Sequence, residues 1–381
     1  MDFFSNLQTP EHRLILEAAT KFAHQHITPN ASRWEEEGEF PRELYLDAGR
    51  AGLLGVGFPL EVGGAGGGAM DQVMVIEGLM RGGSTGVCVG LGSLGIALPC
   101  IVQSHNDALI DRVVRPTLAG ATISALAITE PGTGSDVAGV STRARLEGDY
   151  YHVTGSKLFI TSGVRADFLT ALVRTGDDPH GGLSFLLIEG NQPGVHISPP
   201  LKKTGWHASD TAEITFEEVK VPRSNLIGSP GDGFVTLMKN FQMERLALAA
   251  YGCATAQICL EEASRYARER SAFGRPLAGF QVTRHKLAEM ATATLGAQAL
   301  VYQVANRMDA GQMVVNEVSM AKNLAAQVAV KVSYEAVQIH GGMGYMRETL
   351  VERLSRDARL LPIGGGTHEI MNEIISKGLG L

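Results

Sequence analysis

The spacing of apolar residues divides the chain into three parts. Up to residue 120, apolar positions recur at helical intervals in five segments, near 10–28, 41–52, 70–81, 85–104 and 106–118. From 121 to 228 the pattern changes to short β-branched and aromatic runs separated by Gly, Pro, Asp and Asn, which is typical of strands and turns. Helical spacing then returns in longer segments, near 233–269, 279–309, 314–340, 346–361 and 367–378. The pattern predicts an α+β protein with a helical domain over 1–120, a β domain over 121–228 and a helical domain over 229–381.

Two features of this layout argue against a nucleotide-binding fold of the Rossmann type. The predicted strands follow one another in a run instead of alternating with helices, and no strand leads into a G-x-G-x-x-G turn. Composition narrows the class further. The 381 residues are 44% hydrophobic and 19% charged, as in a globular protein with a large core. A net charge of −7 without a Lys/Arg cluster disfavours nucleic-acid binding.

Residues 82–104 carry no charge and are long enough to cross a bilayer. Six of them are glycine, however, and Pro99 and Gln103 interrupt the apolar run, so we expect a buried core helix and no membrane span. The four cysteines lie in apolar surroundings without a C-x-x-C spacing, which predicts reduced, buried thiols and a cytoplasmic protein. The charged run at 11–13 predicts no signal peptide.

A lone carboxylate interrupts the apolar stripe of the segment 233–269. The neighbours of Glu244 at three and four residues are Asn240, Phe241, Ala247 and Leu248, and the adjacent Arg245 points about 100° away, so no cation lies on the same face of the helix. Carboxylates are almost never fully buried unless they are paired. Glu244 is therefore either a structural group bonded to a distant Arg or to backbone, or a functional group.

The sequence "THEIMNE" at 367–373 begins like a zinc-binding H-E-x-x-H helix. Asn372 occupies the position of the second histidine, and a zinc helix needs both imidazoles on one face. We therefore predict no metal site.

Five motifs in order resemble those of the acyl-CoA dehydrogenase family: "LAITEPGTGSD" (126–136), "KLFITSG" (157–163), "RERSAFGRPLAGFQ" (268–281), "QIHGGMGYMRE" (338–348) and "ERLSRDARLLPIGGGTHEI" (352–370). The resemblance covers essentially the whole chain. It implies a helical N-terminal domain, an antiparallel β-barrel-like middle domain and a C-terminal four-helix bundle. It also implies an FAD enzyme, usually a homotetramer, that oxidises an acyl-CoA to the trans-2-enoyl-CoA and passes electrons to an electron-transferring flavoprotein.

The same resemblance assigns roles to individual residues. Around the flavin and its phosphates it places Ile128, Thr129, Ser135, Phe159 and Thr161. The diphosphate and adenine of a neighbouring subunit's FAD would be held by Arg270, Phe273, Gln281, Gln338, Gly341 and Gly342, with Thr367 and Glu369 closing the grip. Arg offers planar, charge-assisted donors that suit a diphosphate. The acyl-CoA would contact Ser135, Arg245 and Gly366.

One position departs from the common family pattern. Many members carry the catalytic glutamate where this chain has Gly365. A second branch, which includes isovaleryl-CoA, long-chain and citronellyl-CoA dehydrogenases, places the base on the long helix within an "ERL" context, and "QMERLALAA" here matches that branch. The resemblance thus implies Glu244 as the base, with the backbone N–H of Gly365 helping to stabilise the enolate oxygen.

The small residues of 90–97 leave volume where the family's acyl pocket lies, which favours a medium-to-long or branched acyl-CoA. Three alternatives stay open on the same fold: an oxidase that passes electrons to O₂, a flavoprotein with non-redox thioester chemistry, and a non-catalytic binding or assembly protein.

Overall fold

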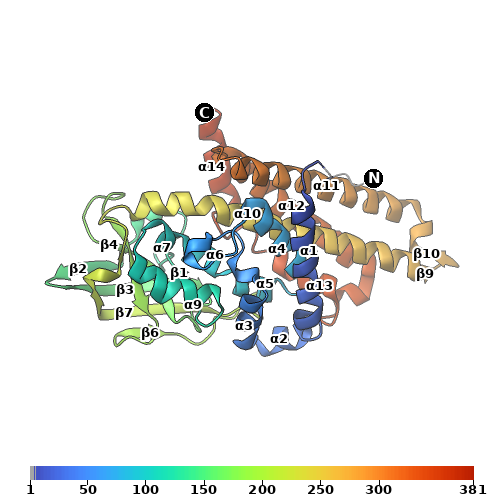
Figure 1. The fold of residues 1–381 in the computed structure, drawn as a ribbon. Helices are drawn as coiled ribbons and strands as arrows, with labels where there is room; N and C mark the ends of the chain where they lie inside the picture. Colours follow the sequence, from blue (N-terminus) through green and yellow to red (C-terminus); the bar gives the residue numbers. More distant parts are fainter. Residues whose placement is uncertain (1–3, 5) are drawn as a thin grey trace.

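The computed structural model describes residue 4 and residues 6–381, so the first residues of the predicted N-terminal domain lie outside the described part. Three regions follow one another along the chain (Figure 1). A helical region is followed by a β-sheet, and long helices complete the molecule. The predicted α+β class, with its three parts in this order, is confirmed.

The N-terminal region consists of short helices, and π-helical turns at Ala23–Ile27 and Ile110–Val114 continue α1 and α8. Its helices are α1 (Pro10–Phe22), α2 (Ala31–Glu37), α3 (Glu43–Arg50), α4 (Ala69–Met80), α5 (Thr85–Gly92), α6 (Leu94–Ala97), α7 (Pro99–Gln103), α8 (Asp107–Leu109) and α9 (Arg115–Leu118). The sequence pattern did not predict α2, a seven-residue helix that ends at Gly38 in the left-handed conformation.

The segment predicted as one helix over 85–104 is broken into α5, α6 and α7. Pro99 has no N–H to donate, and its ring would clash with the carbonyl four residues earlier in a continuous helix. Within the described residues, Thr85–Gln103 is one segment that is long and apolar enough to cross a membrane, with a mean hydropathy of 2.0, and 67% of it is buried inside the protein. It packs against α4, α13 and the long helix α10 (Gly233–Glu269).

The middle region is an eight-stranded sheet in the order β6-β7-β3-β2-β4-β5-β8, with β1 paired to β4. Its strands are β1 (Ser124–Ala127), β2 (Arg143–Glu147), β3 (Tyr150–Thr161), β4 (Phe168–Arg174), β5 (Leu183–Glu189), β6 (Val195–Ile197), β7 (Thr211–Pro222) and β8 (Leu226–Ile227). Most pairs are antiparallel, as expected, but β1 and β2 each run parallel to β4. The register of β3 against β7 shifts between Lys157 and Ile160, and this bulge matters for the site.

The C-terminal region is the predicted helical bundle. α10, α11 (Gln281–Asp309) and α12 (Val315–His340) pack against one another, and α13 (Leu350–Ala358) and α14 (His368–Gly378) pack on α12. α10 runs from the sheet to the opposite end of the molecule, where the two-stranded hairpin of β9 (Ser271–Ala272) and β10 (Arg275–Pro276) projects (Figure 1). Asp309 at the end of α11 accepts hydrogen bonds from the backbone N–H groups of Ala69 and Met70, and so ties α4 to the bundle.

Candidate active site

Glu244 lies in the first third of α10, where that helix passes the N-terminal region. The residue is partly exposed, but its Oε2 is buried and has no hydrogen-bond partner within the described part of the chain. Burial raises the pKa of Glu244 to about 7, although Arg245 and Lys322 act in the opposite direction. A carboxylate that titrates near neutral pH is suited to act as a general base.

Gly365, in the loop between α13 and α14, lies directly against this carboxylate. A Cβ at position 365 would stand 3.4 Å from Oε1 of Glu244 and 2.3 Å from Cδ1 of Leu248. Gly365 also has a φ of +62°, a left-handed conformation that favours glycine. A glutamate on the helix and one at position 365 would therefore compete for the same space, which explains why the loop position carries no side chain here.

Arg245 is buried beside Glu244. Its guanidinium lies over the ring of Phe241, 5.6 Å from the centroid, and its Nε has no hydrogen-bond partner among the described residues. Burial lowers the pKa of Arg245, while the neighbouring Glu244 opposes that shift. Arg245, the predicted substrate contact, is thus a buried cation whose Nε–H is available to a ligand.

A second cation at this site was not predicted. Lys322 on α12 is fully buried, and its Nζ donates a 2.6 Å hydrogen bond to the carbonyl oxygen of Gly366. Burial, with help from Arg245, lowers the pKa of Lys322 to about 8, and Glu244 and Glu369 oppose that shift. The test that singled out Glu244 would have found Lys322 too, since it is a lone charge on an apolar stripe of its helix.

The residues expected around the flavin lie just after β1, at the end of β3 and in the loop before β2. Thr129 follows β1, and its carbonyl accepts a 2.8 Å hydrogen bond from the N–H of Leu158 on β3. Phe159 lies in the bulge of β3 with a φ of +61°, and its side chain is 63% exposed. Thr161, at the end of β3, is partly exposed, and Ser135 is exposed in the loop before β2. Bulges often redirect a side chain next to a functional site, and an exposed aromatic ring in a strained conformation is typical of a ligand surface.

A buried ion pair ties β3 to the segment that follows β1. Lys157 donates hydrogen bonds to Oε1 of Glu130, at 2.8 Å, and to the carbonyl of Ile128, at 2.9 Å. Burial alone would raise the pKa of Glu130, but Lys157 and the Ser141 and Thr142 donors outweigh it and hold the pKa at about 2. The side chain of Ile128 is buried, so Ile128 can present only its backbone to a ligand.

The residues expected to bind the adenine end gather at the opposite end of α10. Arg270 follows the last turn of that helix, Phe273 in the hairpin is 97% exposed, and Gln281 is the first residue of α11. Gln338, Gly341 and Gly342 lie at the end of α12, all of them exposed. Arg270 lies 26 positions after Glu244 along α10, roughly 39 Å at 1.5 Å per residue. The hairpin also lies at the opposite end of the molecule from the sheet that contains β3 (Figure 1), so one chain does not bring the two groups together.

Thr367 and Glu369 were expected to close the grip of the distant group. They lie at the start of α14, directly after the glycine loop. The hydroxyl of Thr367 caps α14 by accepting from the N–H of Ile370. Both residues thus lie on the Glu244 side of the molecule.

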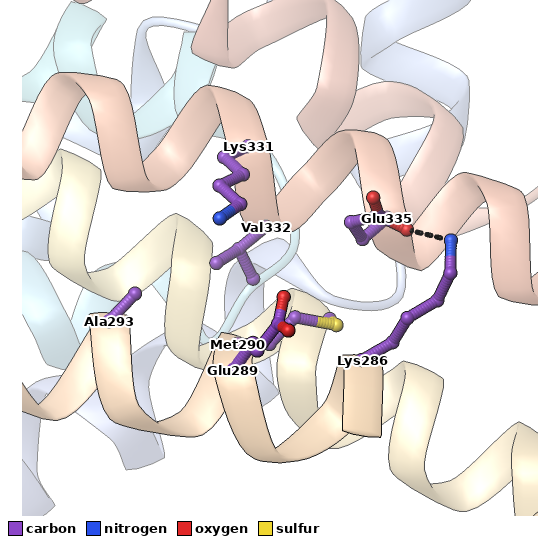
Figure 2. Close-up of a pocket in the computed structure, with 7 residues that line it drawn as sticks. All are labelled: Lys286, Glu289, Met290, Ala293, Lys331, Val332 and Glu335. Carbon is purple, nitrogen blue, oxygen red and sulfur yellow. Dashed lines mark hydrogen bonds and ion pairs between the residues drawn. The ribbon is translucent and has the colours of Figure 1, made fainter. Parts of the chain in front are cut away.

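A small cavity between α11 and α12 lies apart from all of these residues. Figure 2 shows its lining, which includes an ion pair between Lys286 and Glu335, with Nζ 2.5 Å from Oε2. None of the predicted site residues lines it, so this cavity is not the candidate active site.

Three family models together match nearly all of the chain. The acyl-CoA dehydrogenase N-terminal domain matches residues 9–121, the middle domain 125–219 and the C-terminal domain 231–380. The chain belongs to the acyl-CoA dehydrogenase family. Like its relatives, it is an oxidoreductase.

Two curated relatives illustrate the range of this family. The chain is 36% identical to a 3-(aryl)acrylate reductase of Clostridium sporogenes over 97% of its own length and 99% of the relative's. It is also 36% identical to the mitochondrial long-chain specific acyl-CoA dehydrogenase of Sus scrofa, over 96% of its own length and 86% of the relative's.

Solved structures agree on the fold. A probable acyl-CoA dehydrogenase from Mycobacterium abscessus, 54% identical, superposes with a TM-score of 0.96 over 98% of this chain and 100% of that one. A glutaryl-CoA dehydrogenase from Mycobacterium smegmatis, solved in complex with FADH2, is 25% identical and superposes with a TM-score of 0.94 over 99% and 96%.

The cofactor of the chain is FAD, and the described residues fit it. Phe159 is 63% exposed and Thr129 and Thr161 are partly exposed, so they offer the apolar surface and the hydroxyls that a planar polar ring needs. At the distant group, a Cβ on Gly341 or Gly342 would meet nothing within 4 Å, so this turn leaves room for a close ligand.

Proposed function

We propose that this family member oxidises a medium-to-long or branched acyl-CoA to the trans-2-enoyl-CoA, with Glu244 as the base. The observation that carries the proposal is the buried, unpartnered Oε2 of Glu244, on a carboxylate whose Oε1 lies 3.4 Å from where a Cβ at Gly365 would stand, the position at which many relatives place their base. Glu244 on α10 and the absence of a side chain at Gly365 therefore belong to the same arrangement of the base.

The chain's own groups account for the proton transfer. The α-hydrogen of a thioester is weakly acidic, and a dehydrated carboxylate with a pKa of about 7 is a stronger base than one in water. The N–H of Gly365 donates to no group in the described part of the chain, so it is free to bond the forming enolate oxygen. One such donor typically contributes about 3 kcal/mol to the transition state. FAD held by Phe159, Thr129 and Thr161 would supply the acceptor for the hydride that leaves the β-carbon.

The proposed acyl length rests on the glycines of α5 and α6. A Cβ on Gly95 would meet nothing within 4 Å, and one on Gly92 would meet only the hydroxyl of Tyr251, at 2.9 Å. Asn240 on α10 donates to the carbonyl of Ile96, so this wall lies one helical turn from Glu244. Small residues beside the base leave room for a long or branched chain.

The proposal includes a second copy of the chain and a protein electron acceptor. Because Arg270 and Phe273 lie far from Phe159 within one chain, a homo-oligomer, with a tetramer expected, would bring one copy's distant group to another copy's flavin edge. An electron-transferring flavoprotein is the proposed acceptor and the cytoplasm the proposed location.

Anaerobic titration of the purified flavoprotein with a panel of acyl-CoAs tests the reaction. We expect the oxidised flavin absorption band to bleach with medium, long or branched acyl-CoAs. Oxygen uptake without an electron-transferring flavoprotein would instead indicate an oxidase. Because one relative is named a reductase, the reduced protein should also be titrated with enoyl-CoAs. A protein that takes up FAD but is bleached by no acyl-CoA would contradict the proposal and favour non-redox chemistry, and one that takes up no FAD would favour a binding protein.

A further inference from the structure

The loop beside Glu244 has little stiffness of its own. Residues 364–366 are three consecutive glycines, and Gly365 and Gly366 have φ values of +62° and +96°. Glycine has the largest conformational freedom of all residues, so such a loop holds one geometry only if its backbone is anchored. Backbone hydrogen bonds from Gly364 to the carbonyl of Leu360, at 2.9 Å, and from His368 to that of Pro362, at 3.0 Å, close its two ends.

Lys322 provides the anchor at the middle of this loop. Its Nζ reaches from α12 to the carbonyl of Gly366 at 2.6 Å. This bond fixes the plane of the peptide between Gly366 and Thr367, two peptide units after the one whose N–H is proposed to bond the enolate oxygen. The hydroxyl of Thr367 in turn caps α14, so the anchored peptide is held on both sides.

The position is unfavourable for a lysine that serves only the fold. Its side chain is fully buried, its hydrogen bond goes to a neutral carbonyl, and a second buried cation, Arg245, acts on it. An ammonium group loses much hydration free energy on burial unless it is paired. Three other charged groups act on Lys322. These are Glu244 and Arg245 on α10 and Glu369 on α14.

We propose that Lys322 is a positioning residue of the active site, which anchors the glycine loop through the Gly366 carbonyl and supplies positive charge that keeps Glu244 ionised. The inference rests on the proposed role of Glu244. Burial disfavours the carboxylate form of Glu244, and Lys322 and Arg245 oppose that effect. Lys322 does so without a direct bond to the carboxylate, which leaves Oε2 free to accept a proton.

The test compares Lys322→Met with Lys322→Arg and with Lys331→Met, which removes an exposed lysine from the same helix. In Lys322→Met we expect kcat at neutral pH to fall roughly tenfold to a hundredfold, the range for a lost charge-assisted hydrogen bond. The acid limb of the kcat/KM profile should move to higher pH. Lys322→Arg keeps the charge and should restore the position of that limb, and Lys331→Met should match the wild type.

A second readout does not depend on activity. Amide hydrogen exchange in a peptide spanning 362–370 should be faster in Lys322→Met, because the bonds that close the loop open more often, and unchanged in Lys331→Met. If Lys322→Met does not fold, Lys322→Gln also removes the charge. The pH profile and the amide exchange of 362–370 are then measured on that variant. A neutral variant with the wild-type pH profile and wild-type loop exchange would overturn the inference. A wild-type protein that oxidises no acyl-CoA, with faster loop exchange in the variant, would instead reject the proposed function and keep the anchoring role.

Discussion

At the scale of single residues, the chemistry depends on where one carboxylate stands. Glu244 is dehydrated enough to titrate near pH 7, and two cations limit that effect without neutralising Oε2. Replacing it with Gln keeps the shape and removes the base. We expect Glu244→Gln to lower kcat by about 10²–10⁴, the usual contribution of a general base. Glu289→Gln on α11 is a suitable control, and turnover within a few-fold of wild type in Glu244→Gln would reject the assignment.

The pH dependence follows from the same residue. A general base must be ionised before it can accept a proton, so kcat/KM should rise with pH and level off above the pKa of Glu244, near 7. Rates measured across pH 5–9 with the best substrate of the titration panel would show this limb. A profile that is flat through pH 7 would mean that the base titrates elsewhere.

Gly95 allows a separate test of acyl length. Its backbone is not in the left-handed region and a Cβ there would have open space, so Gly95→Leu should leave the fold intact. A leucine would occupy the volume proposed for the acyl chain. We expect kcat/KM to fall more for long or branched acyl-CoAs than for short ones, which serve as the internal control. An equal loss for all chain lengths would place the acyl chain elsewhere.

The sequence predicted some of these residues and not others for physical reasons. Glu244 was recognisable because its helical neighbours are determined by spacing alone. The same spacing also marks Lys322 as a lone charge, but its partner, the carbonyl of Gly366, lies 44 residues away and is backbone, so its role carries no sequence signal. The contact between Glu244 and Gly365 likewise arises only when α10 packs against the loop before α14.

At the scale of elements, the pattern predicted long helices better than short ones. α10 has the predicted bounds, 233–269, because a long apolar stripe without proline has no competing structure. The break of 85–104 into three helices was not predicted, because the apolar spacing continues through it although Pro99 interrupts a continuous helix. The parallel pairing of β1 with β4 was missed as well, because strand order is set by packing across the sheet.

The contact between α4 and α11 contains a buried acid whose ionisation opposes folding. Oε2 of Glu77 accepts a 2.6 Å hydrogen bond from the hydroxyl of Tyr302, while Oε1 is buried without a partner in the described part of the chain. Burial raises the pKa of Glu77 from 4.5 to about 7, outweighing the Tyr302 bond and Arg81. The folded state therefore binds this proton more tightly than the unfolded state, and the associated stability is present below pH 4.5 and lost as pH rises through 7.

We therefore expect Glu77→Gln to stabilise the protein at pH 8 and to have little benefit at pH 4.5. A rise in pKa from 4.5 to about 7 corresponds to roughly 3 kcal/mol, which is the upper limit of the gain. Thermal unfolding at both pH values measures it, with the exposed Glu61→Gln as the control. If Glu77→Gln were equally destabilised at both pH values, Glu77 would be ionised in the folded protein and not a neutral acid.

At the scale of the whole molecule, the two ends of α10 carry two halves of one proposed cofactor site. Phe273 is 97% exposed and its φ is +50°, and within its own chain the ring meets only the edge-on ring of Phe280 at 6.3 Å, so the hairpin presents an aromatic ring in a strained conformation to the surroundings. If a second copy supplies the flavin edge, then FAD retention and self-association must be coupled, because a ligand that binds only the assembled form stabilises the assembly.

We expect Phe273→Ala to reduce the FAD-to-protein ratio of the purified protein and to weaken FAD binding roughly tenfold or more, as for an aromatic contact at an interface. The fold of the single chain should be unaffected, because the ring buries almost no surface within it. Met313→Ala, at another highly exposed apolar position outside the proposed site, is the matched control. Light scattering on serial dilution should show that dissociation of the wild-type assembly coincides with release of flavin. A dilute monomer that keeps its FAD would show that one copy's hairpin is not needed to bind another copy's FAD, and the hairpin would then have some other role.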